Sequence, residues 1–521
     1  MASVPRRGVL KGLPLAAGAA IAGRATNAHA TDVNAASPHA TARATTGATF
    51  PQPATRTVRP RPRRLETRLT VGFTEQRVPG VGTVLTRTYD GSLPGPTLRV
   101  RPGDSLQITQ VNALPPNTAP SHHDLGMNVP HGFNTFNLHL HGMHVDPTGE
   151  ADNVFRSFEP AGTSRRTTTW RSVVDIPVNH PAGTFWYHPH HHGSTATHLL
   201  NGLTGVIIVE GDVDAVPEVA AAEDIVVCIN ELKVSDGKVP DLTSESVYDR
   251  IPSTFLVNGA VSPVLTIAPG EVQRWRVVNA GALTTLYLTL GGQKMHQIAY
   301  DGITFMKPAA VTAFQLPVGG RADLLVRGGE PGVYRLTAGG VRPPLMTLKV
   351  TGTPRTMSLP TRLPGRPTTL PEPTRRRSLI FRSYENVFPG DFTNAYRILG
   401  DGETPHADRE AGRSDVEWGR FRPDYVNHRV RLGQVEEWTV TNDSRRHAHH
   451  PLHLHTNAFL VTAINNRPLA TPVWRDTVGL PPHGSLTLRL RAEDFTGRAM
   501  VHCHQSQHED EGMMQIVEYV R

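Results

Sequence analysis

The last part of the chain combines metal-binding side chains with the spacing of a β-strand. Residues 501–514 read Val-His-Cys-His-Gln-Ser-Gln-His-Glu-Asp-Glu-Gly-Met-Met. On a strand, Cys503 would point to one face and the histidines on either side of it to the other, about 6.6 Å apart. A thiolate, an imidazole and a weak thioether, here from Cys503, His508 and Met513, are the ligands of an electron-transferring copper ion. The stretch is therefore predicted to join one copper site to a second metal cluster through a single cysteine.

Three further histidine motifs could supply the missing ligands. In His-Pro-Leu-His-Leu-His, residues 450–455, the second and third histidines share a strand face and the first faces the other way. The segments 139–141 and 188–190 each point two imidazoles to the same side. The sequence therefore predicts one cluster built from His139, His141, His188, His190, His453, His455, His502 and His504, and a separate site built from His450, Cys503, His508 and Met513.

Less specific interpretations account poorly for this set. A single pair of histidines two residues apart is more often a surface or core pair than a pair of ligands. Zinc binds histidine, but a twelve-ligand set with one cysteine does not divide into closed tetrahedral sites. The agreement of four motifs in parity argues against coincidence. The remaining histidines of these segments fit no ligand position and are expected in loops: His122, His123, His131, His191, His192, His447 and His449.

The four motifs, in this order, resemble those of the three-domain multicopper oxidases, the laccase-like family. The resemblance extends over nearly the whole chain from about residue 65. It implies three cupredoxin-like Greek-key β-sandwich domains and four copper ions, one of type 1, one of type 2 and two of type 3. By this resemblance the type 1 ligands are His450, Cys503, His508 and Met513, the type 2 ligands are His139 and His453, and the type 3 ligands are His141, His188 and His504 for one ion and His190, His455 and His502 for the other.

The same resemblance implies an oxidase that takes single electrons from phenols or aromatic amines and reduces O₂ to water. The electron would be accepted at His508 and would pass through Cys503. Because O₂ reduction consumes protons, buried carboxylates are expected close to the cluster. Glu509 matches the acid that follows the corresponding histidine in the family, and Asp152 is the predicted second acid. Glu150 is its alternative, because the length of the intervening loop is uncertain.

Other functions remain open at this point. A metallo-oxidase acting on Cu(I), Fe(II) or Mn(II) would use the same ligands. The family's cuprous oxidases carry a methionine-rich insertion, whereas the ten methionines here are scattered apart from Met513-Met514. A non-enzymatic relative that has lost its copper should lack ligands, and a copper nitrite reductase should have two domains and no three-copper cluster. The charged segment 396–428 departs from the family pattern.

The chain also contains a threefold repeat. Gly103–Asn112, Gly270–Asn279 and Gly433–Asn442 each combine a turn with an alternating strand, and they lie 167 and 163 residues apart. Such spacing is the size of a domain. Short apolar runs between 47 glycines and 44 prolines, without a long helical period, favour an all-β fold of sandwich domains.

Composition and motif positions suggest the domain limits. The first and third domains each carry two histidine motifs and the second carries none, so the cluster is expected between the first and third, with the second as a spacer. The predicted segments are a signal peptide (1–30), a disordered linker (31–64), domain 1 (65–211), domain 2 without copper (212–351), a second linker (352–376) and domain 3 with the type 1 copper (377–521).

Charge and targeting signals indicate export and exclude a nucleic-acid partner. The formal net charge is +7, and residues 1–64 contribute +9, so the remainder carries −2 and gives no footprint for DNA or RNA. Arg6-Arg7 followed by Ala28-His29-Ala30 resembles a twin-arginine signal with a cleavage site, which predicts a periplasmic or secreted protein. No stretch suits membrane insertion. Cys228 is expected to be a buried free thiol, and the family resemblance implies a monomer.

Overall fold

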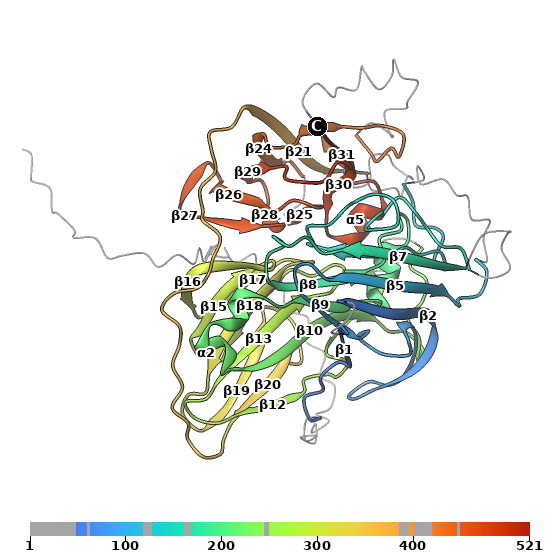
Figure 1. Cartoon of the computed structure of the whole chain (residues 1–521). Coiled ribbons are helices and arrows are strands. Elements are labelled where there is room, and N and C mark those ends of the chain that lie inside the picture. The colour runs from blue at the N-terminus through green and yellow to red at the C-terminus, as the bar shows by residue number, and fades with distance from the viewer. Residues whose placement is uncertain are drawn as a thin grey trace, which may run out of the picture.

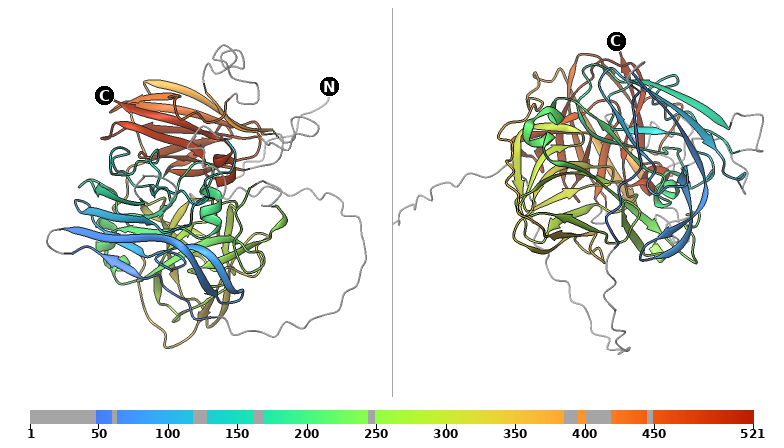
Figure 2. Two further views of the ribbon diagram at one scale, coloured as in Figure 1. Left: turned by 90° about the vertical axis from the view of Figure 1, so that its right-hand side faces the viewer. Right: turned by 60° about the horizontal axis from the view of Figure 1, so that its bottom comes forward.

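The computed structural model describes residues 48–59, 63–117, 128–160, 168–243, 249–384, 395–400, 419–444 and 449–521. Its strands form six β-sheets that pack face to face in three pairs, here called the first, second and third sandwich (Figure 1). The left view of Figure 2 shows that the third sandwich lies over the other two. The all-β prediction is therefore confirmed.

The first sandwich pairs a four-stranded sheet, β3-β2-β5-β7, with a five-stranded sheet, β1-β4-β9-β8-β6. Alternating apolar residues of both sheets, such as Leu69 and Ile108 on one and Phe185 and Ile207 on the other, meet in one buried core. The elements are β1 (Thr55–Thr57), β2 (Arg64–Val78), β3 (Gly82–Tyr89), β4 (Thr97–Val100), β5 (Ser105–Asn112), β6 (His139–His141), β7 (Thr169–Asp175), β8 (Gly183–His188), α1 (Thr195–Leu200) and β9 (Gly205–Val209).

The second sandwich pairs β11-β10-β13-β18-β15-β16 with β12-β20-β19-β14-β17. Its core again draws on both sheets, with Trp275 on one and Leu288 on the other. The elements are η1 (Asp212–Ala215), α2 (Pro217–Ala220), β10 (Glu223–Lys233), β11 (Ser253–Val257), β12 (Val264–Ile267), β13 (Val272–Asn279), β14 (Leu286–Leu290), β15 (Met295–Tyr300), β16 (Ile303–Val311), β17 (Ala313–Leu316), β18 (Arg321–Arg327), β19 (Gly332–Ala338) and β20 (Met346–Val350).

The third sandwich pairs β22-β21-β24-β29-β26-β27 with β23-β31-β30-β25-β28. Trp438 and Leu452 belong to its core, from one sheet each. The elements are β21 (Arg375–Tyr384), β22 (Ala395–Leu399), β23 (His428–Arg431), β24 (Val435–Asn442), β25 (His450–Leu454), β26 (Phe459–Ile464), β27 (Arg467–Arg475), β28 (Thr477–Leu480), β29 (Ser485–Arg491), β30 (Gly497–Cys503), α5 (Ser506–Asp510) and β31 (Met514–Val520).

The three sequence repeats occupy the same place in each sandwich. They form β5, β13 and β24, each parallel to an earlier strand (β2, β10 and β21) and antiparallel to a later one (β7, β18 and β29). The turn before each strand has a glycine with φ of 80°, 75° and 79°, at Gly103, Gly270 and Gly433. This left-handed conformation strongly favours glycine, which explains why the turn recurs in the sequence.

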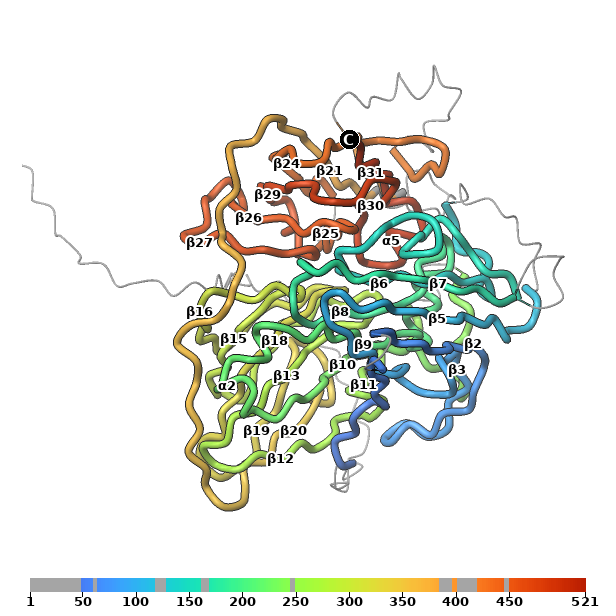
Figure 3. The backbone as a smooth tube through the Cα atoms, viewed as in Figure 1, coloured from blue at the N-terminus to red at the C-terminus, as the bar shows by residue number. Residues whose placement is uncertain are grey.

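The predicted linkers differ in part from the structure. Thr55–Thr57 lies inside the expected disordered segment 31–64 but forms β1, which runs parallel to β4, and Phe50 packs against the core of the second sandwich. The prediction of disorder is wrong for these residues, because backbone pairing at a sheet edge leaves little apolar periodicity in the sequence. Residues 1–47, with the predicted signal peptide, lie outside the described residues. After β20 the chain follows the outside of the second sandwich (Figure 3), and β21 begins at Arg375, inside the predicted linker 352–376.

Candidate metal centre

The four histidine motifs lie on neighbouring strands of two sandwiches. In the first sandwich β6 pairs with β8, which sets His139 opposite His188. In the third sandwich β25 pairs with β30, which sets His453 opposite His502. The corresponding antiparallel pair in the second sandwich, β14 and β19, contains no histidine. Each of the two histidine-bearing sheets therefore presents its imidazoles from one pair of adjacent antiparallel strands.

Strand β30 separates its ligands as the alternation predicts. The Cys503 side chain belongs to the apolar core of the third sandwich, together with Leu452 and Met513. His502 and His504 point to the opposite side, where histidines of the first sandwich meet them. All three residues have no exposed surface. One strand thus contributes to two separate groups of side chains.

The first group surrounds Cys503. Its Sγ lies 3.5 Å from His450 Nδ1 and 3.6 Å from His508 Nδ1, and these two nitrogens are 3.1 Å apart. Ser444 Oγ lies 2.7 Å from His450 Nε2 and so leaves Nδ1 as the nitrogen that faces the thiol. Met513 is fully buried, and its carbonyl accepts a hydrogen bond from the Cys503 N–H.

His508 is covered by an aromatic ring that the sequence did not indicate. Tyr396 of β22 stacks on His508 with 4.0 Å between ring centroids and 19° between planes. The two residues are 3% and 4% exposed. His508 was predicted to accept the electron from the reductant, so Tyr396 occupies one face of the ring through which that electron would pass.

The second group collects the eight other histidines between the first and third sandwiches. Within each of three sets, one ligand atom per residue lies within 4.8 Å of the others. Two sets coincide with the two predicted type 3 shells, and the third joins the predicted type 2 pair to a shared type 3 histidine. The sets are His141, His188 and His504; His190, His455 and His502; and His139, His453 and His455.

Hydrogen bonds at one ring nitrogen of several histidines leave the lone pair of the other nitrogen facing the centre of the cluster. The Nδ1 atoms face acceptors: a carboxylate of Asp152 for His139 at 3.0 Å, the carbonyl of Pro189 for His188 at 2.8 Å and the carbonyl of Asp476 for His453 at 2.9 Å. A neutral imidazole that donates from Nδ1 keeps its lone pair on Nε2. The Nε2 atoms of His139, His188 and His453 are buried and have no hydrogen-bond partner among the described residues.

Burial lowers the pKa of eight of the predicted ligand histidines and so favours their neutral form. It lowers the pKa of His450 to about 3 and that of His190 to about 4, and it holds the pKa of His508 well below its usual range. Burial, reinforced by neighbouring histidines, has the same effect on the pKa values of His141, His188, His453, His455 and His504. Neutral imidazoles are the form that binds metal.

The donor sets fit copper. His455 Nε2 and His502 Nε2 lie 3.2 Å apart, and His190 Nε2 lies 3.3 Å from the latter. Lone pairs that face each other in a buried space are stabilised by a cation between them. Burial raises the pKa of the Cys503 thiol, so a metal ion must displace its proton. A thiolate with two imidazoles and a methionine is a copper set, and imidazole clusters also suit copper.

The predicted acids occupy distinct positions. Glu509 is fully buried, with Oε1 3.3 Å from His190 Nδ1 and Oε2 3.2 Å from His502 Nδ1, and it accepts a hydrogen bond from Thr195 Oγ1. Burial alone would raise the pKa of Glu509, but the two histidines lower it overall. Its neighbour Asp510 accepts three backbone N–H groups at the start of α1, which fixes α5 against the first sandwich.

The structure distinguishes the two candidates for the second acid. Asp152 is buried, contacts His139 and also accepts the N–H of Leu140 at 2.8 Å. Glu150 is exposed. Asp152 therefore orients a predicted ligand, a role that fixes both the ring and its tautomer.

Sequence reasoning missed the contribution of the second sandwich. Arg321 on β18 reaches Asp476 of the third sandwich and His141 of the first. Gly319, with φ of 81°, lies so close to the cluster that a Cβ there would meet His504 Cδ2 at 2.8 Å and His141 Nε2 at 3.0 Å. These residues carry no local motif, because their partners lie far away along the chain.

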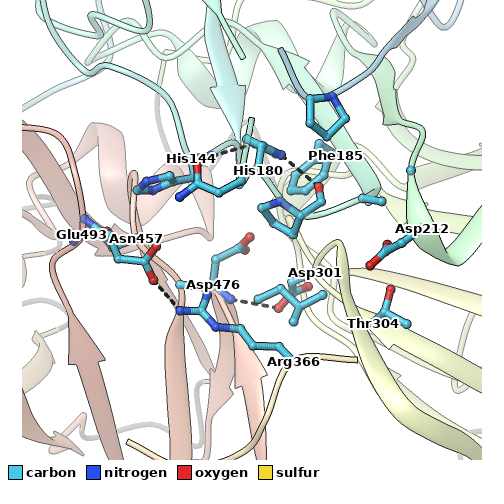
Figure 4. Close-up of a pocket in the computed structure, with 18 of the residues that line it drawn as sticks. His144, His180, Phe185, Asp212, Asp301, Thr304, Arg366, Asn457, Asp476 and Glu493 are labelled. Carbon is cyan, nitrogen blue, oxygen red and sulfur yellow. Dashed lines mark hydrogen bonds and ion pairs between the residues drawn. The ribbon is translucent and has the colours of Figure 1, made fainter. Parts of the chain in front are cut away.

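A cavity of about 570 Å³ lies beside this contact (Figure 4). All three sandwiches and the segment before β21 line it, with Phe185, Asp301, Arg366 and Asp476 among its walls. Asp476 therefore faces the cavity on one side and Arg321 on the other. His508 and Cys503 do not line it.

The predicted loop histidines divide by position. His131 lies beside His191 and His192, with ring centroids 6.0 and 6.4 Å away, and His449 contacts Tyr287. None of these belongs to the metal-ligand groups of the described residues. His122, His123 and His447 lie outside the described part of the chain. In that described part, no helix is both long and apolar enough to cross a membrane.

Family models described as multicopper oxidase match residues 127–214, 230–355 and 403–520. The chain is 24% identical over 438 residues to the multicopper oxidase mco of Staphylococcus aureus, with 82% of each covered. It is 28% identical to a laccase of Bacillus stratosphericus, covering 83% of this chain and 90% of the relative. It is also 26% identical to the cell division protein FtsP of Dickeya dadantii, covering 75% of each.

Solved structures show the same fold. A laccase from Pediococcus acidilactici superposes with a TM-score of 0.73 at 21% identity, covering 91% of this chain and 94% of that one. A multicopper oxidase from Campylobacter jejuni, described as a metallo-oxidase, superposes with a TM-score of 0.69 at 22% identity, covering 90% and 96%. At this level of identity the likeness concerns the arrangement of three cupredoxin-like sandwiches.

Proposed function

Because the chain belongs to the multicopper oxidase family, we propose that it is laccase-like and oxidises phenols or aromatic amines while reducing O₂ to water. The observation that carries the proposal is the position of Cys503 on β30, between His502 and His504. The cysteine belongs to a site for single electrons, and its two neighbours belong to the histidine cluster. One short stretch of backbone joins the two.

The proposed complement is four copper ions, which would supply the one-electron redox chemistry when bound. The type 1 ion would be held by His450, Cys503, His508 and Met513. The type 2 ion would be held by His139 and His453. The two type 3 ions would be held by His141, His188 and His504, and by His190, His455 and His502.

The protein's own residues would guide electrons and protons. An electron accepted beside His508 travels through the Cys503 side chain and backbone to the flanking histidines. Glu509 lies against His190 and His502 and is placed to hold a proton at Oε1 or Oε2 next to the cluster. Thr195, which donates to Glu509, orients that carboxylate. The buried surroundings exclude bulk water from both sites.

A second candidate is a metallo-oxidase for Cu(I), Fe(II) or Mn(II). It is favoured by the burial of His508 beneath Tyr396, because an ion that donates an electron needs no pocket for an aromatic ring. The sequence similarity to a laccase and the structural likeness to a metallo-oxidase are compatible with either reductant.

The discriminating experiment is oxygen uptake by copper-loaded protein with phenols, aromatic amines, Cu(I), Fe(II) and Mn(II) in turn. The laccase proposal predicts the highest kcat/KM with an organic reductant, and a metallo-oxidase with one of the ions. Absence of uptake with all of them would overturn both and would favour a non-catalytic role. An oxidised, fully metallated sample that is colourless would contradict the Cys503 site.

We further propose that the protein is exported by the twin-arginine route to the periplasm or the medium and acts as a monomer. The support is the Arg6-Arg7 motif and the Ala28-His29-Ala30 site. Cell fractionation after replacement of both arginines by lysine tests the route, and retention inside the cell is the expected result. Sedimentation of the mature protein tests the monomer.

A further inference from the structure

We propose that Arg321 of the second sandwich is a positioning residue for the histidine cluster, which it fastens to all three sandwiches at once. The inference rests on the proposed copper cluster. It assigns to the second sandwich, which contains none of the predicted ligands, a direct part in holding His141 and His453 in place.

Arg321 is fully buried, and its guanidinium donates two parallel hydrogen bonds to the Asp476 carboxylate. Nη1 donates to Asp476 Oδ1 at 2.7 Å and Nη2 donates to Oδ2 at 2.6 Å. A bidentate pair of this kind fixes both partners in angle as well as in distance. Asp476 directly precedes β28, so the contact joins the second sandwich to the third.

The remaining donors of Arg321 reach the first sandwich and its own turn. Nε donates to the Thr184 carbonyl at 3.3 Å, and Nη1 also lies 3.2 Å from the Gly319 carbonyl and 3.3 Å from His141 Nδ1. The Nδ1 atoms of His139, His188 and His453 face acceptors, whereas His141 Nδ1 faces the guanidinium of Arg321.

Asp476, which Arg321 holds in place, in turn contacts His453. Its carbonyl lies 2.9 Å from His453 Nδ1, and its carboxylate accepts a hydrogen bond from Thr477 Oγ1, which is itself 3.0 Å from the same ring nitrogen. The rings of His453 and His141 stack with 3.8 Å between centroids and 13° between planes. Arg321 thus stands behind two stacked imidazoles that come from different sandwiches.

A second acid balances the charge of the network. Asp301 accepts the backbone N–H of Arg321 at 3.0 Å and the Nε of Arg475 at 2.7 Å. Arg321, Arg475, Asp301 and Asp476 therefore lie together in a buried space, where two positive charges face two negative charges. Such networks are costly to break, because removing one partner leaves an uncompensated buried charge.

The test compares Arg321→Lys with a matched control, Arg327→Lys, on the same strand. Lysine keeps the charge but cannot make the planar fork. Arg327 is exposed, and its guanidinium donates to the Met357 carbonyl and not to the histidine cluster. We expect Arg321→Lys to lower the copper affinity of the cluster by about 10- to 100-fold, the usual effect of losing a group that orients a ligand. Arg327→Lys should bind copper as the wild type does.

The Cys503 site provides an internal reference within each sample. None of its residues contacts Arg321, so the blue absorbance of the type 1 site should persist while the type 2 paramagnetic resonance signal and the bound copper decline. Loss of both signals in parallel would mean that Arg321 supports folding only. Full retention of both would equally overturn the proposal.

A double variant separates folding from positioning. Arg321→Met with Asp476→Leu removes both buried charges and should fold better than Arg321→Met alone. We expect the double variant to keep the blue absorbance of the Cys503 site and to bind less copper at the histidine cluster. A full copper content at the cluster, or failure of all these variants to fold, would contradict a positioning role for Arg321. Wild-type protein that binds no copper at the cluster would instead refute the proposed function itself.

Discussion

At the scale of single residues, Glu509 offers the most direct test of proton supply. Glu509→Gln keeps the shape of the side chain but removes the group that would hold a proton beside His190 and His502. We expect oxygen consumption to slow by about 10²-fold, the lower end of what a positioned general acid contributes. The blue absorbance should remain, because Glu509 is not among the residues around Cys503.

The matched control is Glu518→Gln on β31, whose carboxylate pairs with Arg429 at the surface. This variant should turn over as the wild type does. Turnover of Glu509→Gln at the wild-type rate would remove Glu509 from the mechanism.

Tyr396 tests how the reductant reaches the Cys503 site. Tyr396→Phe retains the ring that stacks on His508 and should leave the rate of anaerobic reduction nearly unchanged. Tyr396→Leu fills much of the space without an aromatic face and should slow that reduction. Stopped-flow bleaching of the blue absorbance measures both rates. Replacement of the exposed Tyr425 by Leu serves as control, and equal rates in all variants would show that electrons bypass this ring.

Residue types and spacing predicted which histidines the structure groups together and which two lie beside Cys503, because side chains two apart on a strand share a face. The choice between Asp152 and Glu150 could not be made from the sequence, since a loop of unknown path separates both from His141. Arg321 and Tyr396 were missed for another reason. Each meets its histidine only after sandwiches or strands distant in sequence have packed together.

At the scale of elements, the turn between β17 and β18 brings backbone against the cluster. Gly319→Ala places a Cβ within 3.0 Å of His141 and His504, in a conformation with φ of 81° that already disfavours alanine. Gly340 has the same φ of 81° but open space around the added atom. The pair therefore separates the effect of the clash from that of backbone strain.

We expect Gly340→Ala to lose stability only, by about 1 kcal/mol. Gly319→Ala should lose more stability and should also lose copper from the cluster while keeping the blue site. Copper content and thermal unfolding of both variants provide the measurement. Equal copper content in the two variants would mean that the backbone of the turn moves to accommodate the added Cβ and leaves the histidines in place.

The elements themselves were predictable where they follow a regular pattern. The repeated turn and strand around Gly103, Gly270 and Gly433 predicted three related modules. The edge strand β1 and the helix α5 were not recognised, because β1 is held by backbone pairing and α5 is only five residues long. No local pattern indicates that Asp510 of α5 accepts the backbone N–H groups at the start of α1.

At the scale of the whole molecule, buried histidines outside the metal centre make stability depend on pH. Burial lowers the pKa of His180 and of His198 to about 3. The unfolded chain, with an ordinary histidine pKa of about 6.5, binds more protons between these values, so stability falls as the pH drops below 6.5. At pH 5 each of these two histidines should lower the free energy of unfolding by about 2 kcal/mol.

His198→Gln provides the measurement, because an amide can still donate to the Phe133 carbonyl but does not titrate. Urea unfolding of wild type and variant at pH 7 and pH 5 should show a smaller loss of stability in the variant, by about 2 kcal/mol. Copper release in acid affects both proteins and cancels in the comparison. The same loss in both proteins would show that His198 is not responsible.

Strand β30 has a consequence for which changes in chain length the molecule tolerates. Deleting or inserting one residue between Met500 and His504 would exchange the two faces, turning the sulfur toward the histidine cluster and an imidazole into the apolar core. A single-codon deletion there should therefore remove both metal sites at once, whereas one in the exposed connection after β20, at Thr353-Pro354, should be absorbed. The two metal sites therefore depend on the exact number of residues in β30 as well as on which residues they are.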